Sequence, residues 1–516
     1  MSFFKSMATV SGFTLLSRIT GYFRDVMIGS VFGDTGLSDI FFQAFRLPNL
    51  FRRLFAEGAL NSAFIPLFSK INVRKGKRDA QKFAQTVFTI LGFVLLVLTL
   101  VFELFMPQVM GVISPGFKAD PNKFHLAVHM GRIVFPYIFF IAMGALCAGV
   151  LNGLNRFVAA TASPLLLNIF CITALLWHTT NLVQTSYILS WSVLAAGIAQ
   201  FIWVLYACHL LDYKMAVRSL EFSPEVKKLL RRMVPGLASA GVYQINLVIS
   251  NSVASYIPMA VSYLAYADRI NQFPLAMTGI GIGTVLLPLL SEKREKENFE
   301  EAQYLESRVL QFGCFLTFPA TIALYVMALP IIITLFQHGR FTSHMSIEVA
   351  KVLCIYVLAL PPNVAIKILS TSFFARGNTK TPMLMATISI LVNIGLTFLF
   401  FRHFSYYGIA AAAVTASWVN MFMLGGSLLR TADYALDKRI LSSILRLLIA
   451  GALMGGGLFL IRPHVMPYFG HQVVLDFFIL SCYVGFGLIV YLLSVWLLKG
   501  LTVKEFQEIM NRADMK

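Results

Sequence analysis

The chain has 516 residues, and its composition excludes an ordinary soluble protein. Hydrophobic residues make up 58% and charged residues 13%, whereas soluble domains average about 45–50% and about 25%. A soluble protein of this length could not remove so much apolar surface from water. Lys and Arg number 42 against 24 Asp and Glu, a net charge of +18. In a membrane protein, the positions of these charges decide whether they indicate nucleic acid, lipid or an anionic substrate.

Apolar segments long enough to cross a bilayer recur along the whole chain and predict fourteen transmembrane helices. In chain order, the predicted spans are residues 6–32, 38–68, 83–106, 124–151, 158–177, 187–210, 233–256, 261–291, 305–328, 347–374, 383–401, 406–429, 441–461 and 473–498. The gaps between them are short and leave no room for a soluble catalytic domain. The predicted fold class is therefore an all-α polytopic membrane protein.

The basic residues between the predicted spans indicate the orientation in the membrane. The side of the N-terminus carries 26 Lys and Arg in its loops, and the opposite side carries 5. Such an excess marks the cytoplasmic side, so we expect both termini in the cytoplasm. Because basic loops of this kind act as topogenic signals, the positive net charge does not call for a nucleic acid partner.

The second half of the chain weakly repeats the first. Residues 64–69 (FIPLFS) correspond to 286–291 (LLPLLS), and residues 165–169 (LLLNI) correspond to 390–394 (ILVNI). Duplicated bundles on either side of a midplane site are typical of transporters. The predicted parts are an N-terminal six-helix lobe, a basic amphipathic cytoplasmic linker, a C-terminal six-helix lobe and two additional helices, at residues 1–210, 211–232, 233–430 and 441–498.

Charged side chains interrupt the first, second and eighth predicted spans. They are Arg18, Arg24 and Asp25 in the first span, Asp39, Arg46, Arg52, Arg53 and Glu57 in the second, and Asp268 and Arg269 in the eighth. In the second span, successive steps of 7, 7 and 4 residues place four of these charges on one helical stripe: Asp39, Arg46, Arg53 and Glu57. Pro48 is predicted to bend the helix between them or to break it by opening its backbone. We also expect Glu57 to act in a gate, exchanging partners with the Arg24–Asp25 pair.

These arginines outnumber the carboxylates by two. An unpaired guanidinium group at the centre of a bilayer is costly unless a cavity hydrates it or an anion joins it. Arg is also the residue suited to bidentate contact with phosphate. The pattern predicts a water-filled cavity that binds an anionic, phosphorylated headgroup. The alternative is a structural set of Asp–Arg pairs that neutralise each other between packed helices.

Three sequence blocks in these spans resemble the MurJ (MviN) family. They are residues 17–25 (SRITGYFRD), 45–59 (FRLPNLFRRLFAEGA) and 266–269 (YADR), the last followed by Phe273-Pro274. The resemblance runs essentially from end to end and implies a flippase for lipid II, the undecaprenyl-diphosphate-linked peptidoglycan precursor of bacteria. It also implies the fold of the multidrug/oligosaccharidyl-lipid/polysaccharide exporter superfamily, with two six-helix lobes around a central cavity and two extra helices forming a groove for the lipid tail.

The resemblance also implies site residues. The family's essential cavity arginines fall on Arg18, Arg24, Arg52 and Arg269, and its functional acids fall on Asp39 and Asp268. With the residues taken from the charge pattern, the predicted substrate-binding set is Arg18, Arg24, Arg52, Arg53 and Arg269, and the predicted acids are Asp25, Asp39, Glu57 and Asp268. Two positions depart from the family pattern: Arg46 replaces an expected Lys, and Gln272 replaces a Glu found in many relatives.

We therefore expect a transporter, not an enzyme, that moves lipid II from the inner to the outer leaflet of the bacterial cytoplasmic membrane by alternating access. Alternatives are a flippase for another polyprenyl-diphosphate-linked glycan and, with less support, a multidrug antiporter, which would favour surplus acid over surplus Arg. A glycan polymerase would need a catalytic carboxylate in a long outer loop, and the outer loops here are short.

The expected partners are lipid II, the lipids of the inner membrane and the cell-wall synthesis machinery. No cofactor is expected, and no pair of cysteines has metal-ligand spacing. Transport would draw on the membrane potential or on a monovalent cation, and the sequence does not locate a site for such an ion.

Overall fold

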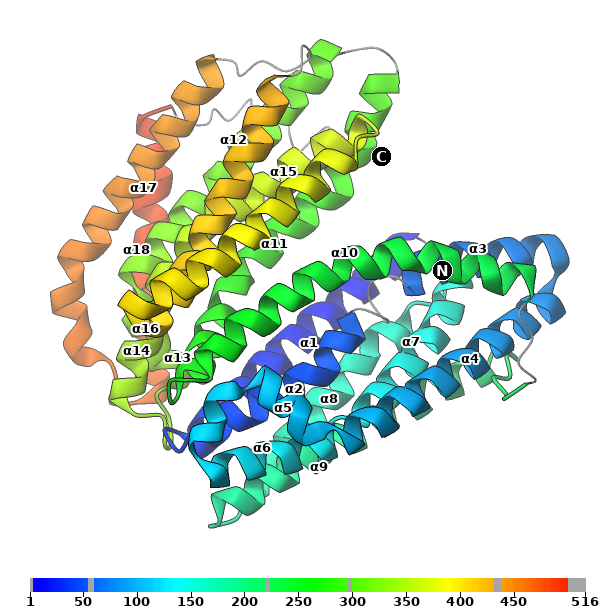
Figure 1. Ribbon diagram of the computed structural model, residues 1–516. Helices are drawn as coiled ribbons and strands as arrows, with labels where there is room; N and C mark the ends of the chain where they lie inside the picture. Colours follow the sequence, from blue (N-terminus) through cyan, green and yellow to red (C-terminus); the bar gives the residue numbers. More distant parts are fainter. Residues whose placement is uncertain (1–2, 54–59, 219–222, 296–298, 431–437, 500–516) are drawn as a thin grey trace. The chain divides into compact units, whose positions relative to one another are not determined.

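A computed structural model of the protein describes residues 3–53, 60–218, 223–295, 299–430 and 438–499. The secondary structure of these residues is entirely helical (Figure 1), which confirms the predicted all-α class. Among them, nine helical stretches are long and apolar enough to cross a membrane. The chain divides into two compact units, residues 1–262 and 263–516, and each is described by itself.

The first unit contains ten α-helices and one 3₁₀-helix among its described residues. They are α1 (Phe3–Phe32), α2 (Leu37–Arg52), α3 (Leu60–Lys75), α4 (Lys77–Leu104), α5 (Met106–Ile113), η2 (Pro115–Ala119), α6 (Pro121–Val134), α7 (Tyr137–Gly153), α8 (Val158–Leu176), α9 (Leu182–His209) and α10 (Pro224–Ala254). The unit ends within the first turn of α11 (Ala260–Glu295). The predicted limits of the lobes and the linker stay a prediction.

The second unit contains the rest of α11 and seven further α-helices in its described part. They are α12 (Phe299–Val326), α13 (Ala328–Phe336), α14 (Ser343–Tyr356), η3 (Val357–Ala359), α15 (Leu360–Ala375), α16 (Lys380–Leu429), α17 (Lys438–Val465), η4 (Met466–Tyr468) and α18 (Val473–Leu497). The order from α4 to α9 recurs from α12 to α16, with the short helices α5 and α13 in corresponding places. This order agrees with the weak sequence repeat.

Three details differ from the sequence-based expectation. The predicted span 38–68 is divided between α2 and α3, and Pro48 lies inside α2, which continues to Arg52. Pro48 therefore does not break the helix: Pro removes one hydrogen bond of the helix, and packed membrane helices tolerate that loss. A bend of α2 at Pro48 stays a prediction. Conversely, α16 contains both predicted spans 383–401 and 406–429, which meet at a sharp kink at Ser405.

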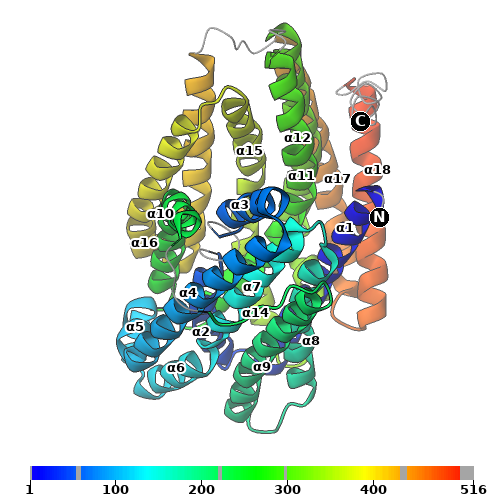
Figure 2. The same ribbon diagram turned by 90° about the vertical axis from the view of Figure 1, so that its right-hand side faces the viewer.

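Aromatic stacking joins the helices of the first unit. Phe64 of α3 stacks on Phe83 of α4 with ring centroids 5.6 Å apart, and Phe102 of α4 stacks on Phe135 at 4.8 Å. The helices α8 and α9 run side by side (Figure 2), and α1 packs against α8. This packing brings side chains of α1 within hydrogen-bonding distance of α8.

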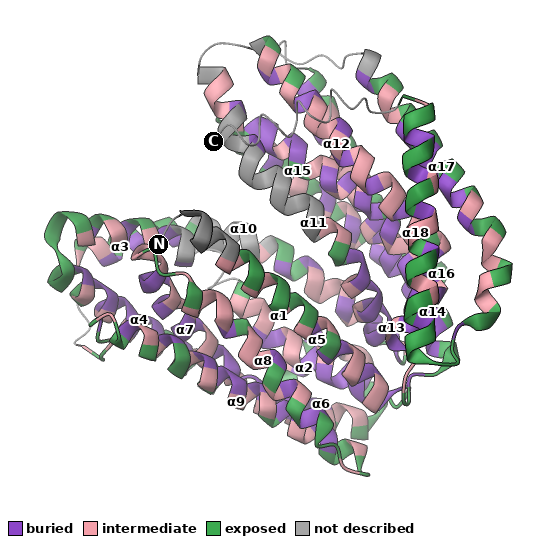
Figure 3. Cartoon of the chain, turned by 180° about the vertical axis from the view of Figure 1, so that it is seen from behind, coloured by how far each residue is buried: buried purple, intermediate pink, exposed green. Residues whose placement is uncertain are grey.

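In the second unit, small residues bring α17 close to α12. A Cβ atom at Gly451 would lie 2.8 Å from Ile322 Cδ1, and one at Gly455 would lie 2.5 Å from Ile322 Cγ2. Exposed residues recur along α17 and α18 (Figure 3), and many of them are large and apolar, including Phe459 and Leu460. Extended apolar surface of this kind is stable against lipid and not against water, as expected for membrane helices.

Candidate functional site

Arg24 and Asp25 form a buried pair on α1. The Arg24 side chain donates to Asp25 Oδ1 from Nε at 3.0 Å and from a terminal nitrogen at 2.8 Å, and the two side chains are only 10% and 4% exposed. The other terminal nitrogen of Arg24 donates to Asn168 Oδ1 on α8 at 3.1 Å. The Asn168 amide in turn donates to the Ser17 carbonyl at 2.9 Å and to Thr20 Oγ1 at 3.0 Å. Arg24 is therefore held between two helices.

The other predicted arginines of the first unit are more accessible than Arg24. Arg18 on α1 and Arg53 after α2 are exposed, whereas Arg46 and Arg52 are half-buried. Arg52 Nε donates to Asn49 Oδ1, one turn earlier on α2, at 3.1 Å. Arg18 and Arg53 thus present guanidinium groups that an anionic ligand can reach, and Arg24 does not in this conformation.

Asp39 lies at the start of α2, fully buried, and its carboxylate caps the start of α11. It accepts hydrogen bonds from the Met259 backbone N–H at 2.8 Å, from the Ser262 N–H at 2.9 Å and from Ser262 Oγ at 2.6 Å. Lys123 Nζ lies 3.5 Å from Asp39 Oδ2, the oxygen that also accepts the hydrogen bond from Met259. A carboxylate at a helix N-terminus is favoured by the unbonded N–H groups there and by the helix dipole. In this structure Asp39 is therefore a structural cap.

The predicted site residues of the second unit lie on α11. Asp268 accepts a hydrogen bond from the Gln272 side-chain amide one turn along the helix, and Asp268 and Arg269 are both half-buried. A neutral amide can donate to Asp268, which an ionised Glu at this position could not do. Glu57, the predicted gate residue, lies outside the described residues.

Two polar clusters were not predicted as such. The first is the set around Asn168, which lies within the sequence repeat; a lone Asn in an apolar span is the signal that could have identified it. In the second unit, Glu348 of α14 accepts hydrogen bonds from both Tyr406 and Tyr407, which follow the kink of α16. Lys351 Nζ lies 2.9 Å from Glu348 Oε1. No sequence spacing connects Glu348 to the two tyrosines, because α14 and α16 meet only in the folded unit.

Comparison with known proteins gives a matching family model and sequences that are similar over most of their length. The family model described as lipid II flippase MurJ matches residues 28–480. A probable lipid II flippase MurJ from Rhizobium meliloti (strain 1021) is 42% identical over 463 residues, which are 89% of this chain and 86% of that protein. The lipid II flippase MurJ of Burkholderia cenocepacia is 34% identical over 466 residues, covering 88% of this chain and 89% of that protein.

Solved structures extend the similarity to the fold. A lipid II flippase MurJ in an inward closed conformation has a TM-score of 0.79 at 27% identity, covering 94% of this chain and 97% of that one. An inward-facing multidrug resistance MATE family transporter of the MOP superfamily has a TM-score of 0.66 at 15% identity, covering 80% of this chain and 95% of that one. At that identity, the second likeness shows a shared fold alone.

Proposed function

Because the chain belongs to the lipid II flippase MurJ family, we propose that it moves lipid II from the inner to the outer leaflet by alternating access. It is a transporter and not an enzyme, and it is a multi-pass protein of the bacterial inner membrane. We also propose a set of substrate-binding residues and an orientation with both termini in the cytoplasm. The cell-wall synthesis machinery is the proposed protein partner.

The arginines of the first unit differ in burial and in hydrogen bonding, and this difference supports the proposed site. The Arg24 guanidinium is occupied by Asp25 and Asn168, and Asp39 is occupied by backbone amides and Lys123. Arg18 and Arg53 remain exposed. We assign first contact with the diphosphate of lipid II to Arg18 and Arg53.

Arg52 and Arg269, both half-buried, complete the proposed substrate-binding set. Arg24 would join it when a conformational change releases it from Asp25. A guanidinium group contacts two phosphate oxygens at once, which suits a diphosphate. Asp25, Glu57 and Asp268 are proposed as cavity acids that pair with these arginines when the substrate is absent, with Glu57 in the gate.

The test is transport in vesicles that contain the purified protein and labelled lipid II, with outer-leaflet lipid II measured by a membrane-impermeant reagent. Arg18→Ala and Arg53→Ala should each reduce the transport rate by roughly 10- to 100-fold, the scale of a lost hydrogen bond to a charged group. Arg→Lys at the same positions should retain part of the rate, because Lys keeps the charge but loses the bidentate contact.

Arg78→Ala is the matched control, because Arg78 is an exposed arginine at the start of α4 and outside the proposed site. It should transport like the unmodified protein. Full transport by Arg18→Ala and Arg53→Ala together would overturn the site assignment. Equal transport of a different glycan on the same diphosphate carrier would favour a general flippase over one specific for lipid II.

A further inference from the structure

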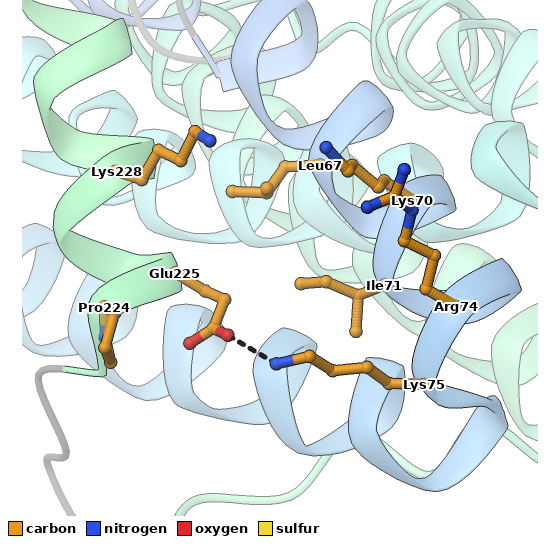
Figure 4. Close-up of a pocket in the computed structure, with 8 residues that line it drawn as sticks. All are labelled: Leu67, Lys70, Ile71, Arg74, Lys75, Pro224, Glu225 and Lys228. Carbon is orange, nitrogen blue, oxygen red and sulfur yellow. Dashed lines mark hydrogen bonds and ion pairs between the residues drawn. The ribbon is translucent and has the colours of Figure 1, made fainter.

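A small pocket lies between α3 and the first turns of α10, within the first unit (Figure 4). It is lined by Leu67, Lys70, Ile71, Arg74, Lys75, Pro224, Glu225 and Lys228, and we call it the α3–α10 pocket. Its volume is about 250 Å³, below the roughly 300–1,000 Å³ of sites for drug-sized ligands. The pocket therefore suits a compact group, such as a single phosphate.

The lining carries four cations and one carboxylate. Lys75 Nζ lies 2.7 Å from Glu225 Oε1, so this pair is neutral overall. Lys70, Arg74 and Lys228 then remain as three positive charges, and no second carboxylate lines the pocket. In Figure 4, Lys228 extends from α10 and Lys70 from α3 toward the space beside Leu67. Like charges gathered in this way repel one another, and a bound anion would relieve that repulsion.

The position of the pocket along α3 corresponds to the lipid headgroup layer. The second predicted span ends at residue 68, and α3 continues as a helix to Lys75. With a rise of ~1.5 Å per residue, Lys70 and Arg74 lie about 3 and 9 Å beyond that end. The headgroup layer occupies about 5–8 Å on each side of the apolar core. By the charge asymmetry of the loops, this end of the helix faces the cytoplasm.

We propose that the α3–α10 pocket binds the phosphate group of an anionic phospholipid of the inner leaflet. Arg74 would contact two phosphate oxygens, and Lys70 and Lys228 would add point charges from the two helices. Leu67 and Ile71, which are buried apolar residues, would contact the glycerol and the first acyl carbons. A purely topogenic role requires only that basic residues lie on the cytoplasmic side; it does not require them to converge on one pocket from two helices.

The test compares the binding of fluorescent phosphatidylglycerol and phosphatidylcholine to the full-length protein in detergent. The pocket variant combines Lys70→Gln, Arg74→Gln and Lys228→Gln. The matched control combines Lys227→Gln, Arg231→Gln and Arg232→Gln, which removes three exposed charges from α10 outside the pocket. The preference for phosphatidylglycerol should fall at least tenfold in the pocket variant, since each cation near an anionic lipid contributes roughly fivefold. An equal fall in both variants would overturn the proposal.

A second variant keeps the test decisive if the triple variant folds poorly. Lys228→Gln alone removes one cation of the pocket and keeps the Lys75–Glu225 ion pair, so affinity for phosphatidylglycerol should fall by roughly fivefold; an unchanged or higher affinity would contradict the proposal. Inorganic phosphate should not displace the bound lipid at equal concentration. Displacement at equal concentration would assign the pocket to a soluble phosphate compound and overturn the lipid assignment.

Discussion

At the residue scale, variants of the buried Arg24–Asp25 pair can distinguish a structural role of Arg24 from a role in substrate binding. Arg24→Ala would leave the Asp25 carboxylate buried without its nearest cation, which costs about 3–5 kcal/mol when a buried ion pair loses one partner. We therefore expect Arg24→Ala to lower the thermal unfolding midpoint and the amount of protein in the membrane. Protein level by immunoblot and unfolding of the purified protein would measure both effects.

The control for this prediction is the double variant. Arg24→Ala with Asp25→Ala removes both charges, so it should recover much of the stability that Arg24→Ala loses. Transport should stay low in the double variant if Arg24 also contacts substrate after release. A stable Arg24→Ala protein would contradict the structural role, which rests on the hydrogen bonds to Asp25 and Asn168.

At the element scale, the kink of α16 places a serine in a conformation that favours glycine. Ser405 has φ 57° and ψ −145°, a region almost restricted to Gly, where another residue costs about 1–3 kcal/mol. Ser405→Gly should therefore raise the free energy of unfolding by about 1 kcal/mol after the greater chain entropy of Gly is subtracted, and the unfolding midpoint should rise with it. Calorimetric or fluorescence-monitored unfolding in one detergent would measure the change.

Gly408 lies one turn beyond the kink, and adding a side chain there should lower the stability of the protein. A Cβ atom at Gly408 would lie 2.9 Å from the Phe401 backbone nitrogen and would also press on the Phe400 carbonyl. Because backbone atoms cannot move aside as a flexible side chain can, Gly408→Ala should destabilise the protein. Stabilisation by Gly408→Ala, or a loss of stability in Ser405→Gly, would contradict this description of the kink.

A second prediction at this scale concerns the ion pair between α3 and α10. The hydrogen bond from Lys75 lowers the pKa of Glu225 from its ordinary value of 4.5. A carboxyl group with a lowered pKa in the folded protein stabilises it above the unfolded pKa and loses that effect as pH falls through the folded pKa. The α3–α10 contact should therefore be constant near neutral pH and loosen in acid, below the ordinary pKa of Glu.

Spin labels on Val73 of α3 and Lys227 of α10, both exposed, would measure this change as a broader distance distribution at low pH. Lys75→Met removes the hydrogen-bond donor, so the variant should show the broad distribution already at neutral pH. The same acid transition in Lys75→Met and in the unmodified protein would show that another group is responsible.

At the scale of the whole molecule, the fold was more predictable from the sequence than the state of the site. Apolar length and charge spacing predict membrane helices directly, because the bilayer imposes the same requirement on each segment. Side-chain partners depend on which helices pack together. The stripe from Asp39 to Glu57 predicts a shared helix face, yet Asp39 bonds to Met259 and Ser262, far away in sequence.

Helix packing, which the local sequence does not specify, also explains why the helix does not break at Pro48 and why the role of Asn168 was missed. Both depend on packing between helices that the local sequence does not specify: Pro48 is buried, and Asn168 meets Arg24 only because α1 packs against α8. Family resemblance names positions in a site, but it does not show which of them are occupied by protein partners in a given conformation.

The orientation of the molecule in the membrane is the last prediction. The segments between predicted spans carry 26 Lys and Arg on the N-terminal side and 5 on the opposite side. This excess predicts that segments 69–82 and 292–304 lie in the cytoplasm and that segments 107–123 and 329–346 lie outside. Single cysteines at Val73 and Arg340, both exposed, would test it after the six natural cysteines are replaced. In intact cells, a membrane-impermeant maleimide should label position 340 and leave position 73 unlabelled until the membrane is permeabilised. Labelling of position 73 in intact cells would invert the topology, and with it the assignment of the α3–α10 pocket to the inner leaflet.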